Sequence, residues 1–127
     1  DALRAYIEEL KPCLSPDTEV VLENKVNLRA IERLFQLIVD EAVDINMLLI
    51  TDSVTANPDS YRSTFFTLVE LKLFDYDFAN QISESVKLRN VLVHEYERIQ
   101  NRDMIDMVKK YVPLYEKYIA ILIKEKP

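Results

Sequence analysis

The sequence predicts an all-α fold, an antiparallel bundle of four to five helices, and three observations support this prediction. Apolar residues recur at the three-and-four spacing of an α-helix over a long central stretch. The 127-residue chain contains no glycine, which argues against tight β-hairpins. Turn-forming residues gather at positions 51–60, between two helical patterns. A chain of this length is expected to form one domain, residues 1–127, with its own core.

Two helical patterns are predicted within the first 50 residues. A short one covers residues 2–11 and is ended by Pro12 and Pro16. The second is a long helix at about 19–50 whose apolar seam is Leu28, Ile31, Phe35, Ile38, Ala42, Ile45 and Leu49. Further apolar residues widen its buried face, which favours the central helix of a bundle: Leu34, Leu37, Val43, Met47, Leu48 and Ile50.

Three more helical segments follow the loop "TDSVTANPDS". Helix resumes at Tyr61 and extends to about residue 74. The carboxylates of "DYD" at 75–77 can cap the next helix, which contains "RNVLVHEY". The last helix begins near Asp103. Pro113 is expected to bend or split it, because proline cannot donate to the carbonyl of Lys109.

The composition excludes several classes of protein and site. With 49% apolar and 30% charged residues spread evenly, the chain is expected to be soluble and cytoplasmic, without a membrane span. One cysteine, Cys13, and one histidine, His94, exclude an intramolecular disulfide and a Cys/His zinc set. The lack of glycine excludes phosphate-cradling loops. No cofactor and no structural metal are therefore expected.

Charge is unevenly distributed along the chain. Residues 1–86 hold 7 Lys+Arg and 16 Asp+Glu, a balance of −9; residues 87–127 hold 9 and 6, a balance of +3, which together give the net charge of −6. An acidic total disfavours general nucleic-acid binding. A local basic surface is still compatible with the C-terminal part, and its candidates, alternatively a simply solvated helix face, are Lys87, Arg98, Arg102, Lys109 and Lys110.

Arg89 stands in an apolar seam of its helix, where the other members are Phe78, Ile82, Val86, Val93 and Tyr96. A guanidinium in such a place is costly unless a carboxylate, a phosphate or solvent in a cleft meets it. The structural interpretation pairs it with Asp40 or Asp44 of the long helix. Of these, Asp44 is the favoured supporting acid because apolar residues surround it. The functional interpretation makes Arg89 a phosphate ligand.

His94 follows Arg89 by five residues, which separates the two side chains by about 140° on an unbroken helix. They converge on one ligand only if the helix loosens near His94 or if two copies of the chain each supply a face. A histidine near a helix end is alternatively a structural group that faces the helix dipole. Tyr96 returns to within about 20° of Arg89.

The pattern R-N-x3-H-x-Y, formed by Arg89, Asn90, His94 and Tyr96, resembles the signature of HEPN-domain proteins. In particular it resembles HepT-like toxins that pair with a minimal nucleotidyltransferase antitoxin. The segments "LVHEY", "DEAVDINMLLI" and "YRSTFFTL" are similar to the same subgroup. The resemblance covers about residues 25–120.

The resemblance implies a HEPN-like bundle that forms a homodimer and acts on RNA as a metal-independent endonuclease. It implies that Arg89 clamps phosphate, that His94 is the general acid or base, and that Asn90 orients the site. It further implies that the antitoxin transfers AMP from ATP onto Tyr96, whose added phosphate excludes RNA. Two other functions are compatible with the residues: a catalytically silent helical partner of a nucleotidyltransferase, and a plain dimeric scaffold.

Overall fold

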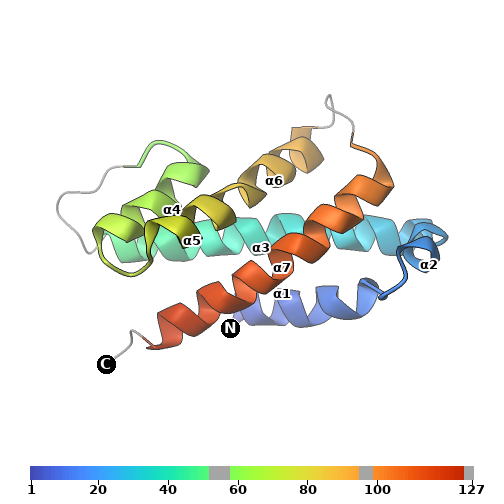
Figure 1. Ribbon diagram of the computed structural model, residues 1–127, viewed down its shortest axis with the longest axis horizontal. Helices are drawn as coiled ribbons and strands as arrows, with labels where there is room; N and C mark the ends of the chain where they lie inside the picture. Colours follow the sequence, from blue (N-terminus) through green and yellow to red (C-terminus); the bar gives the residue numbers. More distant parts are fainter. Residues whose placement is uncertain (52–57, 95–98, 125–127) are drawn as a thin grey trace.

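The computed structural model describes residues 1–51, 58–94 and 99–124, and every regular element in these ranges is a helix. Figure 1 shows the elements, which in chain order are α1 (Ala2–Leu10), the 3-10 helix η1 (Lys11–Cys13), α2 (Thr18–Leu22), α3 (Lys25–Thr51), α4 (Tyr61–Glu70), α5 (Tyr76–Ser83), α6 (Ser85–His94) and α7 (Asn101–Lys124). The predicted all-α bundle is confirmed. No helix in these ranges has the length and apolar character needed to cross a membrane.

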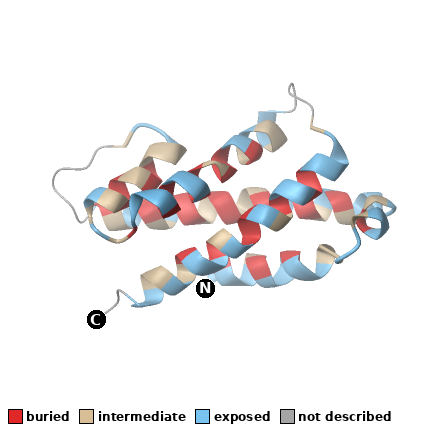
Figure 2. Ribbon diagram, in the orientation of Figure 1, coloured by how far each residue is buried: buried red, intermediate tan, exposed pale blue. Residues whose placement is uncertain are grey.

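Helix α3 is the centre of the bundle and packs against α1, α4, α6 and α7 (Figure 1). Its predicted seam faces the core: Leu28 to Ala42 of the seam are buried, and Ile45 and Leu49 are half-buried. Figure 2 shows the buried residues on the inward faces of the helices. The predicted second set is wrong at Met47 and Leu48, which are 42% and 70% exposed, because the neighbouring helices cover only part of the circumference of α3.

Two predicted long helices are divided in the structure. The helix expected at 19–50 is split into α2 and α3, and Asn24 between them accepts a hydrogen bond from the Asn27 amide at 3.0 Å. The helix expected from Asp77 is split into α5 and α6 at Glu84. There the Ser85 hydroxyl donates to the Ile82 carbonyl at 2.6 Å, a local contact that competes with helix continuation.

The boundaries of α4 and α5 follow standard capping chemistry. Asp75 accepts a hydrogen bond from the Phe78 amide at 2.8 Å, so the predicted carboxylate cap is confirmed. Helix α4 ends at Glu70, earlier than expected, because Lys72 adopts a left-handed conformation with φ of 65°. The amides of Lys72 and Leu73 then donate to the carbonyls of Val69 and Leu68, each at 2.9 Å.

Pro113 does not split the last helix, which runs without interruption from Asn101 to Lys124. A proline within a helix costs about 3 kcal/mol because one backbone hydrogen bond is lost. Val112 and Tyr115 on either side are buried in the core, at 4% and 0% exposure. Their packing keeps α7 against the bundle on both sides of the proline.

A buried hydrogen-bond network centred on Asn46 joins three helices. The Tyr118 hydroxyl of α7 donates to Asn46 Oδ1 of α3 at 2.5 Å and lies 3.0 Å from the Ala42 carbonyl. Asn46 Nδ2 donates to the Thr64 hydroxyl of α4 at 3.0 Å, and Thr64 donates to the Tyr61 carbonyl at 2.7 Å. The first turn of α4 is therefore tied to the core.

The Tyr118→Phe substitution should lower the free energy of unfolding by about 1–3 kcal/mol, because it leaves the buried Asn46 Oδ1 without its hydrogen-bond donor. Urea unfolding followed by circular dichroism measures this loss. Tyr76→Phe is the matched control, because Tyr76 is 61% exposed and the substitution keeps its ring. Equal stability of Tyr118→Phe and the unsubstituted chain would contradict the importance of the network.

Candidate active site

Arg89 of α6 is held by three contacts, two with other helices and one with the next residue of α6. Its Nε donates to Asp40 Oδ1 of α3 at 2.9 Å, and its Nη1 donates to Asn90 Oδ1 at 3.1 Å. Its guanidinium carbon lies 4.7 Å from the centroid of the Tyr61 ring of α4. The Arg89 side chain is 17% exposed. The guanidinium is thus held in one orientation and still reaches solvent.

The acid that pairs with Arg89 is Asp40, and not Asp44, which the sequence favoured. Asp40 and Asp44 lie one turn apart on α3, but Asp44 is exposed. Asp44 acts only at longer range, as a charge that contributes to raising the pKa of Tyr61. The difference arises because α6 crosses α3 beside Asp40, which spacing along α3 alone does not reveal.

Tyr61 is a member of this cluster that sequence reasoning missed. Partial burial raises the pKa of its hydroxyl, the Asp40 carboxylate raises it further, and Arg89 acts in the opposite direction. The hydroxyl therefore stays protonated near neutral pH. The segment "YRSTFFTL" was notable only for its family resemblance, and no spacing in the sequence connects Tyr61 with Arg89.

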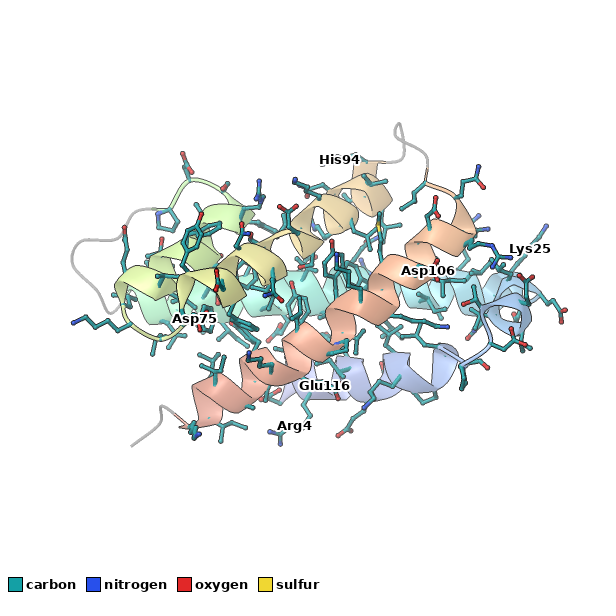
Figure 3. All side chains as sticks on the ribbon, viewed as in Figure 1. Arg4, Lys25, Asp75, His94, Asp106 and Glu116 are labelled. Carbon is teal, nitrogen blue, oxygen red and sulfur yellow. The ribbon has the colours of Figure 1, made fainter. Side chains whose placement is uncertain are left out.

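His94 is the last residue of α6 and is exposed at the end of that helix (Figure 3). Because α6 is helical from Ser85 to His94, the side chains of Arg89 and His94 remain about 140° apart around its axis. Loosening of the helix between the two residues is therefore not what brings them together. Asn90 is exposed beside Arg89, and Tyr96 lies outside the described residues.

The described basic residues that the sequence singled out in the C-terminal part have partners other than the Arg89 cluster. Arg102 pairs with Glu19, and Lys109 Nζ donates to the Thr18 hydroxyl at 3.0 Å, so both are directed to α2. Lys87 pairs with Glu84 at 2.8 Å, and Lys110 lies over the Tyr111 ring. Arg98 is outside the described ranges. The tyrosines of α7 at 111, 115 and 118 are buried and serve the core.

A family model described as "Ribonuclease HepT-like" matches residues 3–122. The tRNA nuclease HepT of Aphanizomenon flos-aquae is 29% identical over 117 residues, which cover 90% of this chain and 80% of that protein. A putative RNase of Archaeoglobus fulgidus is 26% identical over 116 residues, covering 90% and 87%.

Two solved structures have the same fold. The tri-AMPylated HEPN toxin of Shewanella oneidensis, solved with its MNT antitoxin, gives a TM-score of 0.81 at 19% identity and 98% coverage of both chains. A toxin–antitoxin complex with AMP-PNP gives a TM-score of 0.87 at 17% identity, covering 98% of this chain and 93% of that one. At these identities the likeness establishes the HEPN fold.

Replacing Asp40 by alanine should lower the free energy of unfolding by about 1.5–3 kcal/mol, because it leaves the half-buried Arg89 without its charged hydrogen-bond partner. Chemical denaturation measures the change. Asp44→Ala removes the same charge from an exposed site one turn away and should change stability by less than about 0.5 kcal/mol. Similar losses in both variants would argue against the specific Asp40 contact.

Proposed function

Because the chain belongs to the HepT-like ribonuclease family, we propose that it is the RNA-cleaving toxin of a toxin–antitoxin pair, with Arg89 and His94 as its catalytic residues. The observation that carries this proposal is the Arg89 guanidinium, which is oriented by Asp40, Asn90 and Tyr61 and still open to solvent. A purely structural arginine needs one acid. An arginine that binds phosphate needs a guanidinium held in one orientation, with N–H groups that are not used by the protein. Nη2 of Arg89 donates to no described protein atom.

The proposed reaction is metal-independent cleavage through the ribose 2'-hydroxyl. A neutral His94 imidazole takes the proton of this hydroxyl, whose oxygen attacks the adjacent phosphorus and displaces the 5'-oxygen. A protonated imidazole returns a proton to that leaving oxygen, so the products are a 2',3'-cyclic phosphate and a 5'-hydroxyl. Arg89 neutralises the charge that develops on the phosphorane oxygens. Asn90 helps to hold the Arg89 side chain through its Oδ1.

The proposal includes a homodimer, because the geometry of α6 separates the two catalytic groups of one chain. In a two-fold assembly, Arg89 of one copy and His94 of the other face a shared cleft, and the two histidines supply the base and the acid. The supporting role assigned from sequence to Asp44 is compatible only with long-range electrostatics, whereas Asp40 makes the direct contact with Arg89.

The proposed regulation is transfer of AMP from ATP onto the Tyr96 hydroxyl by a minimal nucleotidyltransferase antitoxin, with pyrophosphate as the leaving group. Support comes from the similar fold of a tri-AMPylated HEPN toxin that was solved with its MNT antitoxin. Tyr96 follows His94 by two residues in the sequence. We expect a phosphate added to Tyr96 to compete with RNA phosphate for the Arg89 guanidinium, because both offer oxygens that accept paired hydrogen bonds from arginine.

Cleavage of tRNA in the presence of a metal chelator tests the enzyme proposal, and tRNA is the substrate class suggested by the tRNA nuclease relative. His94→Ala should reduce the rate about 10²–10⁴-fold and Arg89→Ala about 10²–10³-fold. Arg4→Ala, an exposed arginine on α1, should leave the rate unchanged. If the folded Arg89→Ala and His94→Ala variants cleave as fast as the unsubstituted chain, these residues are not catalytic. If the unsubstituted chain does not cleave tRNA, the alternative of a catalytically silent partner subunit stands.

Incubation with the cognate nucleotidyltransferase and ATP, followed by intact-mass measurement, tests the regulation. The chain should gain one or more AMP units and lose tRNA cleavage together. Tyr96→Phe should block the mass gain, because it removes the acceptor hydroxyl. Tyr76→Phe is the matched control, an exposed tyrosine whose loss should leave the modification intact. Modification of Tyr96→Phe to the normal extent would exclude Tyr96 as the acceptor.

A further inference from the structure

Helix α3 packs against α6, and Arg33 belongs to the same face of α3 as Asp40, the partner of Arg89. Arg33 lies farther toward the end of α6 that carries His94. We propose that Arg33 binds a second phosphate of the RNA backbone next to the one held by Arg89, and that Gln36 keeps it in place. This inference rests on the proposed nuclease function. It adds to the cleft an anion-binding residue that neither the motif nor the charge pattern indicated.

The position of Arg33 follows from a row of polar residues along α3. Asp40 contacts Arg89, and Gln36, one turn earlier, donates from Nε2 to the Leu92 carbonyl at 3.4 Å. As the residue number falls along α3 it rises along α6, so the two helices run in opposite directions where they meet (Figure 1). Arg33 continues the row toward the His94 end of α6, because it precedes Gln36 by three residues.

A direct contact joins Arg33 to this row. Its Nη1 donates to Gln36 Oε1 at 3.4 Å, so a single amide links the Arg33 guanidinium with the last turn of α6. Leu92 is two residues from His94. The same amide therefore orients the Arg33 guanidinium and ties down the segment that carries His94.

The charge of Arg33 is available for an anion. Arg33 is exposed and forms no ion pair with any carboxylate in the described part of the chain. Arg29, one turn earlier on α3, pairs with Glu32 at 3.5 Å. A guanidinium that has an amide partner but no carboxylate partner, and that is linked through Gln36 to the last turn of α6, suits a phosphodiester.

The spacing assigns Arg33 to a different phosphate from that of Arg89. Arg33 lies about 10 Å along α3 from Asp40, the partner of Arg89, at 1.5 Å rise per residue. Two guanidiniums separated in this way can bind two neighbouring phosphates of one RNA strand, the one that is cleaved and the one next to it. The competing interpretation is structural: a cation near the C-terminal end of α6 stabilises its dipole and has no role in RNA binding.

Equilibrium binding of a tRNA transcript separates the two interpretations, with His94→Ala in every variant to prevent cleavage. Adding Arg33→Ala should weaken binding about tenfold and flatten the dependence of log affinity on log salt by about 0.7–0.9, the value of one lost phosphate contact. Arg33→Lys should restore part of the affinity and part of the salt dependence, because it restores the positive charge. Gln36→Leu should weaken binding in the same direction as Arg33→Ala, since it releases the Arg33 guanidinium.

The matched control is Arg29→Ala, which removes one positive charge from the same helix one turn away and should change affinity by less than about twofold. Equal losses for Arg29→Ala and Arg33→Ala, no loss for Arg33→Ala, or no binding by the His94→Ala parent would overturn the inference. A loss of thermal stability without a loss of affinity would establish the structural interpretation instead. Lack of cleavage by the unsubstituted chain would refute the nuclease alone, because the binding comparison needs no turnover.

Discussion

The ion pair between Arg89 and Asp40 is the contact on which the candidate site depends. A guanidinium placed in the apolar seam of α6 carries a large desolvation cost, and a neighbouring carboxylate offsets it only if the geometry is good. Here the Nε of Arg89 meets Asp40 at 2.9 Å while the ring of Tyr61 covers one face. The pair is 17% and 33% exposed, so it lies at the edge of the core, where an anion can still reach the arginine.

The rest of the bundle keeps the three partners of this cluster in register. Asn46 connects Tyr118 with Thr64, and Thr64 in turn holds the Tyr61 carbonyl, so the first turn of α4 cannot move independently of the core. The Ser85 hydroxyl lies 2.6 Å from the Tyr115 hydroxyl and ties the start of α6 to α7. Buried polar contacts of this kind are costly when incomplete and specify one arrangement when satisfied. They make the orientation of Arg89 a property of the whole fold.

The chain has a net charge of −6 but belongs to a ribonuclease family, and the positions of its cations bear on this difference. Several basic residues of the C-terminal part are paired within the chain, Arg102 with Glu19 and Lys87 with Glu84. Under the proposed function, we expect RNA affinity to depend on a few well-placed guanidiniums rather than on a broad basic surface. The contact between α3 and α6 offers two of them, Arg89 and Arg33, on facing helices.

The sequence by itself determined the helical class, the central helix with its buried seam, the Asp75 cap and the family, because apolar spacing, capping chemistry and a short motif are local properties. It also identified Arg89 as a residue that needed a partner. Only the tertiary structure decided that this partner is Asp40, that Tyr61 covers the guanidinium, and that Gln36 reaches the last turn of α6. Those contacts join residues from different helices. They depend on the crossing of α3, α4 and α6, which no periodicity along one helix encodes.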